Sequence, residues 1–217
     1  MTIKIAIDGP AGSGKSTVAK ILAKKLNFVY VDTGALYRAI TYKILKEGIN
    51  INEKKAILNI INNFDITLKS ERIFLDGIDI TEEIRKPYIS QNVSQISQIP
   101  EIREFMVKLQ KELANKNNIV MDGRDITTVV MPDAQFKFYI TATEEVRAKR
   151  RYNELKANNF NISFKDILNE IKIRDKMDME RSIAPLKIAE DAIVVDTSDM
   201  TIDEVTNKLY DIIIKQL

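Results

Sequence analysis

The sequence contains no cysteine and no histidine among its 217 residues. Without cysteine there are no disulfides and no thiolate metal sites, and without histidine the commonest general base and metal ligand are absent. Nucleophilic hydrolysis by Ser-His-Asp or Cys-His groups is therefore excluded, and a zinc site is not expected. Phosphoryl transfer survives these absences, because its transition state requires positioning and charge neutralisation more than covalent help from the protein.

The chain also lacks a strong excess of one charge and lacks long hydrophobic runs. Lys and Arg number 33 against 31 Asp and Glu, so the net charge of +2 gives no reason to expect nucleic acid or an anionic membrane as a partner. No stretch approaches the roughly 18 apolar residues of a membrane-spanning helix, and Asp8 interrupts the first apolar run too early for a signal peptide. We expect a soluble, cytoplasmic monomer with one sizeable core.

The stretch around which the chain is organised lies at its start. Ile3, Ile5 and Ile7 form a short apolar run of strand type, and the pattern GxxxxGKS and a helical pattern follow it. In such a loop the glycines let backbone N–H groups point inward, so a polyphosphate can sit on the positive end of the next helix. Lys15 reaches the terminal phosphates, and the Ser16 hydroxyl can ligate Mg²⁺. The residues predicted to bind a nucleoside triphosphate are Gly9, Pro10, Ala11, Gly12, Ser13, Gly14, Lys15, Ser16 and Thr17.

Strand and helix signals alternate along much of the chain. Each predicted strand is short and apolar and is followed by polar residues or a helix, which is typical of a parallel sheet covered on both faces. We therefore predict an α/β fold, a phosphate-loop three-layer α/β/α arrangement with a five-stranded parallel sheet. The strands are predicted at residues 3–7, 28–31, 118–121, 136–140 and 192–195, and helices at about 36–45, 144–157, 163–179 and 202–216.

One segment interrupts this alternation. Residues 64–68, 73–75 and 78–80 form three short strand patterns, with turns predicted at 70–71 and 76–77. The second turn is Asp-Gly, which is a strong hairpin signal between alternating strands. We predict a small antiparallel insertion over about 63–84, followed by helices at about 88–98 and 101–115.

Polar clusters follow two of the predicted parallel strands, at 32–38 and 122–125. Ligands of such sheets sit at the carboxyl ends of the strands, so both clusters should face the phosphate loop. Asp122 is a candidate Mg²⁺ partner, with a structural role in capping the next turn equally open. For Asp32 we favour the structural role, since carboxylates at strand ends often cap the following helix.

A basic cluster lies on the helix predicted at 144–157. Arg150 and Arg151 follow Arg147 by three and four positions, so the three side chains share one helix face. Taken alone, this pattern favours a solvated basic face or a weak RNA-binding patch.

Six motifs occur in order along essentially the whole chain. They are GPAGSGKST at the start, DTGALYR at 32–38, VSQI followed by PEIREF at 100–105, DGRDITTVVMPDA at 122–134, IKIRDKMDMERSIAPL at 171–186 and a terminal VVDTS. Together they resemble the bacterial-type cytidylate kinases, which are phosphate-loop nucleoside monophosphate kinases. The resemblance implies one kinase domain over 1–217, with an inserted nucleoside-monophosphate-binding subdomain at about 63–100 and a short helical lid at about 147–162.

The resemblance also implies roles for single residues. It reverses the interpretation of the basic cluster, because Arg147, Arg150 and Arg151 would belong to a lid that closes over ATP. The cytosine base would be read by Ser94, Arg103 and Asp125. The residues implied in catalysis are Lys15, Arg124, Arg174, Asp178 and Arg181. Those implied in CMP binding are Thr33, Arg38, Ser94, Arg103, Arg124, Asp125, Arg174, Asp178 and Arg181, and Ser16 with Asp122 would serve the metal.

The function that these observations predict is ATP-dependent phosphorylation of CMP and dCMP to CDP and dCDP, with Mg²⁺ accompanying ATP. One alternative is a phosphate-loop kinase for another small acceptor such as UMP. A second alternative is a nucleotide-dependent regulatory switch. Such switches generally read guanine with an NKxD segment, and the two Asn-Lys pairs, at 115–116 and 207–208, lack the Asp two positions on.

Overall fold

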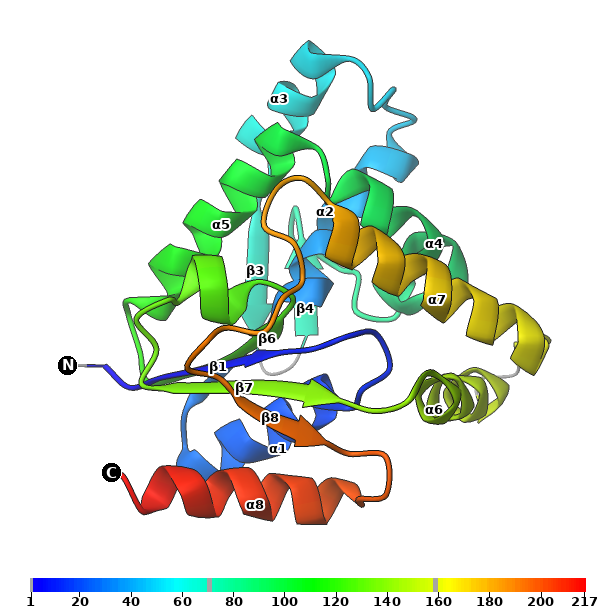
Figure 1. The fold of residues 1–217 in the computed structure, drawn as a ribbon. Coiled ribbons are helices and arrows are strands. Elements are labelled where there is room, and N and C mark those ends of the chain that lie inside the picture. The colour runs from blue at the N-terminus through cyan, green and yellow to red at the C-terminus, as the bar shows by residue number, and fades with distance from the viewer. Residues whose placement is uncertain (1, 70–71, 158–159) are drawn as a thin grey trace. The chain divides into compact units, whose positions relative to one another are not determined.

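The computed structural model describes residues 2–69, 72–157 and 160–217 (Figure 1). It contains two compact units, one formed by Met1–Asp32 with Lys111–Leu217 and the other by Thr33–Gln110. Each unit has its own sheet. The predicted turn at 70–71 lies outside the described residues, as do residues 158–159 of the predicted lid range.

The first unit is built on a five-stranded parallel sheet with the strand order β2-β6-β1-β7-β8. This confirms the predicted α/β class with five parallel strands. Figure 1 shows two of its helices, α1 and α8, together on one side of the sheet. The strands are β1 (Lys4–Asp8), β2 (Val29–Asp32), β6 (Ile119–Gly123), β7 (Phe136–Thr141) and β8 (Ile193–Asp196), and the helices are α1 (Lys15–Leu26), α6 (Glu144–Ala157), α7 (Phe164–Glu180) and α8 (Ile202–Ile214).

The three central strands, β6, β1 and β7, are short and mostly apolar because both of their faces are buried. Ile5 and Ile7 of β1 and Phe138 of β7 have no exposed surface. Helices α1 and α8 pack apolar stripes against this cluster, including Leu22 and Leu209. Because the carboxyl ends of the parallel strands meet at one edge, acidic residues at or near the ends of β1, β2 and β6 come together there, and the strand register pairs Asp32 with Asp122.

The second unit carries the predicted antiparallel insertion as the three-stranded sheet β3-β4-β5. The turn between β4 and β5 has positive φ at Asp76 (51°) and Gly77 (77°), as a tight hairpin turn of the favoured hand requires. Lys43 secures this turn through an ion pair with Asp76 at 2.8 Å. The elements are α2 (Thr33–Lys46), α3 (Lys54–Asn62), β3 (Ile66–Lys69), β4 (Arg72–Leu75), β5 (Ile78–Asp79), the 3₁₀ turn η1 (Glu83–Arg85), α4 (Pro87–Ile96) and α5 (Pro100–Ala114).

Three short elements were not predicted. Helix α3 (Lys54–Asn62) is only nine residues long and buries just Ile57 and Ile60, so its periodic signal is short. The others are the 3₁₀ turn η1 (Glu83–Arg85) and a π-helical turn, η2 (Ile126–Val130), which begins directly after Asp125. The predicted elements themselves are present, and α6 has the predicted bounds.

The structure explains several helix starts. Ser163 precedes α7 and its side chain accepts a hydrogen bond from the Asp166 backbone N–H. Thr201 precedes α8 in a complete capping box with Glu204. Among the described residues, no helix is both long and apolar enough to cross a membrane.

Candidate active site

The loop between β1 and α1 has the geometry of a phosphate loop. Gly9, Gly12 and Gly14 all have positive φ, at 154°, 73° and 86°. Gly14 also precedes α1 without any side-chain hydrogen bond to the helix start. At Gly9 an added Cβ would lie 2.0 Å from the Ile140 carbonyl oxygen, so the loop passes directly against β7. The start of α1 is therefore left to accept an anion through its backbone N–H groups.

Lys15, the first residue of α1, turns back over this loop. Its side chain donates a hydrogen bond from Nζ to the Pro10 carbonyl oxygen at 3.1 Å, and the residue is buried. Burial, together with the positive charges of Arg124 and Arg174, lowers the pKa of Lys15 to about 7. Asp122 and Asp32 act in the opposite direction but do not cancel this effect, so Lys15 is a buried cation whose charged form a bound phosphate would favour.

Asp122, near the end of β6, is the centre of a buried hydrogen-bond network. Its two carboxylate oxygens accept from the Ser16 hydroxyl at 2.7 Å and from the Tyr30 hydroxyl at 2.9 Å. Burial and the neighbouring Asp32 raise the pKa of Asp122 to about 6. Tyr30 fixes one oxygen of the carboxylate, so the other is directed at Ser16 beside the phosphate loop.

This network suits a hard divalent cation in its chemistry. The Ser16 hydroxyl and the Asp122 carboxylate offer oxygen ligands, which Mg²⁺ prefers, and Asp32 adds a second carboxylate on the adjacent strand. Magnesium usually takes only one or two protein ligands and the phosphates of its substrate. No group of three or more acidic ligands that could hold a metal by itself occurs within residues 2–69, 72–157 and 160–217.

Two arginine–aspartate pairs tie the segment after β6 to the end of α7. Arg124 donates from Nε to an Asp178 carboxylate oxygen at 2.8 Å. Arg181 approaches Asp125 at 3.4 Å and donates from Nε to the Ala184 carbonyl oxygen at 2.6 Å. Burial acts to raise the pKa of Asp178, but Arg124 and Arg174 outweigh it and hold that pKa below its ordinary value. Four of the predicted catalytic residues are thus gathered in the unit that carries Lys15: Arg124, Arg174, Asp178 and Arg181.

The three arginines of the basic cluster on α6 have different surroundings. Arg147 is buried and pairs with Asp175 at 2.6 Å. Arg150 donates to the carbonyl oxygens of Ser13 (3.2 Å) and Thr197 (2.6 Å). Arg151 is partly exposed and pairs with Glu154 at 2.8 Å, within its own helix. Arg147 and Arg150 therefore contact other elements of the unit, while Arg151 is partly exposed and pairs only within its own helix among the contacts described.

The remaining predicted acceptor residues belong to the unit Thr33–Gln110. Thr33 begins α2 and Arg38 follows one and a half turns later, whereas Ser94 lies on α4. Arg103 of α5 donates to the Ser97 carbonyl oxygen at 3.1 Å and lies over the Tyr37 ring, 5.4 Å from its centroid. Their predicted role in binding CMP stays a prediction.

Sequence reasoning missed three residues that shape the site: Asp8, Tyr30 and Asp175. Asp8 accepts hydrogen bonds from the backbone N–H groups of Ile126 (3.0 Å) and Thr127 (2.8 Å) and from the Thr127 hydroxyl (2.6 Å). It therefore caps η2 and fixes the backbone that follows Asp125. Burial raises the pKa of Asp8 to about 6 despite these donors. A signal was available, because Asp8 is a carboxylate that directly follows the apolar residues Ile5–Ile7 of β1.

Comparison with known proteins places this geometry in context. A family model described as cytidylate kinase matches residues 5–215. A cytidylate kinase of Caldanaerobacter subterraneus subsp. tengcongensis is 56% identical over 215 residues, covering 99% of this chain and 96% of that protein. A cytidylate kinase of Clostridium botulinum (strain Loch Maree / Type A3) is 50% identical over 213 residues, covering 98% of each. A crystal structure of a gluconokinase from Sinorhizobium meliloti 1021 has a TM-score of 0.50 at 13% identity, covering 96% of this chain and 90% of that one, which is a likeness of fold alone.

Proposed function

The chain belongs to the cytidylate kinase family, and we propose that it transfers the terminal phosphoryl group of ATP to CMP and dCMP, producing CDP and dCDP. The observation that carries this proposal is the phosphate loop, in which Lys15 turns back to the Pro10 carbonyl oxygen at 3.1 Å and the Ser16 hydroxyl meets the Asp122 carboxylate at 2.7 Å. An ammonium and a carboxylate-bound hydroxyl at the start of α1 suit a nucleoside triphosphate with its cation. We expect the protein to act as a cytoplasmic monomer.

The chemistry requires no general base, which suits a chain without histidine. The phosphate of CMP already offers an ionised oxygen as the nucleophile, so the main obstacle is repulsion between two phosphate groups. Arginine guanidinium groups bind phosphate oxygens bidentately and offset that repulsion. In this proposal Lys15 and the loop N–H groups hold ATP, and Arg124 and Arg181 act on the acceptor phosphate.

A magnesium ion is proposed to accompany ATP. The Ser16 hydroxyl and the Asp122 carboxylate would hold it, and it would supply charge neutralisation on the phosphate oxygens. Tyr30 keeps the Asp122 carboxylate in place through its 2.9 Å hydrogen bond.

The test of the proposed function is a coupled assay with ATP as the donor and CMP, dCMP, UMP, AMP and GMP as acceptors. Turnover of CMP and dCMP above the other three is expected. Preference for UMP, AMP or GMP would instead favour a kinase for another acceptor. Hydrolysis of nucleotide with no acceptor turnover would favour a regulatory switch.

Conservative changes in Arg124 and Arg181, the arginines proposed to act on the acceptor phosphate, should affect the kinetics with CMP and not those with ATP. Arg124→Lys and Arg181→Lys each keep the positive charge opposite their aspartates but lose the bidentate fork. We expect each to raise KM for CMP or lower kcat by about tenfold or more, since a charge-assisted pair contributes roughly 1.5–3 kcal/mol. Little change in KM for ATP is expected. Steady-state kinetics with each substrate varied in turn measures both effects, and a selective loss of ATP affinity would assign these arginines to the other nucleotide.

Nucleotide binding should take up a proton near neutral pH. The pKa of Lys15 is lowered to about 7 in the nucleotide-free protein, and bound phosphates favour the charged ammonium, so the pKa rises on binding. ATP affinity should therefore be full below pH 7 and fall as the pH rises above it, by up to about tenfold per pH unit. Calorimetry at pH 7.5 in buffers of different ionisation enthalpy measures the proton uptake. A binding enthalpy that is the same in every buffer would contradict this prediction.

A further inference from the structure

The phosphate loop is held from outside by side chains of α6 and α7. Arg147 donates from Nη1 to the Ala11 carbonyl oxygen at 3.0 Å and from Nε to the Ala142 carbonyl oxygen at 2.8 Å. Asp175 accepts from the Ala11 backbone N–H at 3.3 Å and from Arg147 at 2.6 Å. Both polar atoms of Ala11 are therefore occupied by one buried ion pair.

Arg150 makes a similar contact to the loop two residues after Ala11. It donates to the Ser13 carbonyl oxygen at 3.2 Å, and the Thr197 hydroxyl approaches the same oxygen at 3.3 Å. The backbone of the loop also lies tightly against α6, because a Cβ added at Gly12 would be 3.0 Å from the Arg147 carbonyl oxygen. The Ala11 and Ser13 carbonyls of the loop thus each accept a hydrogen bond from a guanidinium group.

These contacts affect the inward side of the loop through the peptide bond. The Ala11 carbonyl belongs to the same peptide group as the Gly12 N–H, and the Ser13 carbonyl to the same group as the Gly14 N–H. A cation on the oxygen of a peptide group polarises it, so its N–H becomes a stronger donor, and chained hydrogen bonds strengthen one another. A charge-assisted bond to each carbonyl also fixes the direction of the N–H.

We propose that Arg147, Arg150 and Asp175 are positioning residues for ATP. In this proposal, which rests on the proposed kinase function, the two arginines orient and polarise the loop peptides from behind, and Asp175 orients Arg147. Arg147 then acts on ATP through the loop and makes no phosphate contact of its own. This differs from the lid role that the resemblance implied for Arg147.

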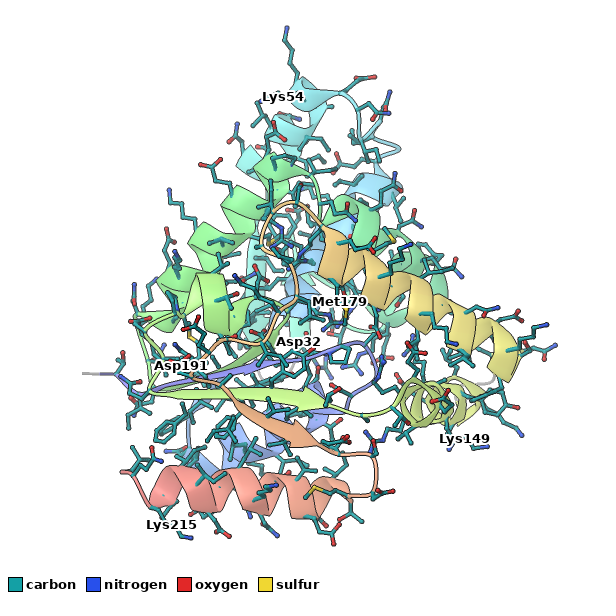
Figure 2. The ribbon with its side chains drawn as sticks, in the orientation of Figure 1. Asp32, Lys54, Lys149, Met179, Asp191 and Lys215 are labelled. Atoms are coloured by element: carbon teal, nitrogen blue, oxygen red, sulfur yellow. The ribbon has the colours of Figure 1, made fainter. Side chains whose placement is uncertain are left out.

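Three variants test the proposal. Arg147→Lys and Arg150→Lys keep the charge but cannot form the same set of bonds. The double variant Arg147→Met with Asp175→Leu removes the ion pair as a unit, and such a replacement by apolar residues is often neutral or stabilising. Matched controls are Lys149→Met, an exposed residue of α6 labelled in Figure 2, and Glu180→Gln, an exposed acid of α7.

We expect each of the three variants to weaken ATP binding by about tenfold or more, since small misplacements of binding groups carry large costs. Their affinity for CMP, measured by the same titration calorimetry, should stay near that of the wild type, as should both affinities of the controls. Thermal melting establishes that each variant is folded. A folded double variant with wild-type ATP affinity would overturn the proposal, and an equal loss for ATP and CMP would show a merely structural role.

A measurement on the wild type makes the test independent of any variant. The Ala11 amide should be protected from hydrogen exchange in the nucleotide-free protein, because Asp175 accepts its hydrogen bond. Exchange as fast as that of exposed loop amides would overturn the proposal. The ATP and CMP titrations need no turnover, so a wild type that binds ATP but does not phosphorylate CMP would refute the proposed function and leave this inference standing or failing on its own.

Discussion

Replacing Lys15 with alanine is expected to reduce turnover by about 10³-fold or more while the protein stays folded, since contacts of this kind to transferring phosphates are worth that much in rate. The side chain is a buried ammonium whose burial lowers its pKa to about 7. Its Nζ donates a hydrogen bond to the Pro10 carbonyl oxygen. Removing a charge held in unfavourable surroundings should therefore leave the melting temperature unchanged or raise it.

Turnover with ATP and CMP, together with thermal melting, measures both parts of this prediction. Lys24→Ala is the matched control, because Lys24 is an exposed lysine of the same helix. It should behave as the wild type in both measurements. Near wild-type turnover in a folded Lys15→Ala protein would refute the phosphate-loop assignment, and unfolding would show that Lys15 serves packing.

The second large expected effect concerns how the protein distinguishes the cytosine base of CMP from the uracil base of UMP. Cytosine presents an amino group, a donor, at the position where uracil presents a carbonyl oxygen, an acceptor. If the Asp125 carboxylate reads this position, UMP leaves two acceptors facing each other without a proton between them. Sites built on such bonds discriminate by roughly 10⁴, and a partly solvated site achieves less. We therefore expect kcat/KM for CMP to exceed that for UMP by at least about a hundredfold, as one or two lost charge-assisted bonds imply.

Asp125→Asn should narrow this preference. The asparagine amide can rotate to donate to the uracil oxygen. The kcat/KM for CMP should therefore fall relative to that for UMP. Because Asp125 also lies 3.4 Å from Arg181, the change weakens that ion pair and lowers activity with both acceptors. The ratio of the two kcat/KM values cancels this shared loss and is the quantity to measure. An unchanged ratio in Asp125→Asn, or a wild type that uses UMP as well as CMP, would show that Asp125 does not read the base.

The sheet and the phosphate loop could be predicted because their signals are local. Ile5 and Ile7 sit in an apolar run of strand length, and the glycine spacing that follows has few other uses. The Asp76-Gly77 pair is likewise a local signal, and it correctly predicted a hairpin in the antiparallel insertion. The observed strand ends differ from the predicted ones by one or two residues. A polar residue at the end of a strand, such as Asp32, keeps its pairing, although its residue type is typical of a loop.

The internal support of the site could not be predicted, because its contacts join distant parts of the chain. Asp8 is 118 residues from Ile126, whose N–H it accepts. Asp175 is 164 residues from Ala11. Nothing in the local sequence around either aspartate specifies such a partner. The spacing of Arg147 and Arg150 correctly placed both on one helix face, yet spacing alone could not show that this face holds the phosphate loop from behind.

The close passage of the phosphate loop against β7 limits which amino-acid substitutions the protein can accept at Gly9. In a saturation library selected for activity, codon 9 should accept only glycine, because even one methyl group would lie 2.0 Å from the Ile140 carbonyl oxygen. Codons 48 and 77 also encode glycines with positive φ, but an added Cβ there meets nothing within 4 Å. Asparagine tolerates that backbone region, so it should persist at both codons after selection. Glycines that all have positive φ would thus fall into two classes of mutational tolerance, according to whether a neighbouring carbonyl leaves room for a side chain.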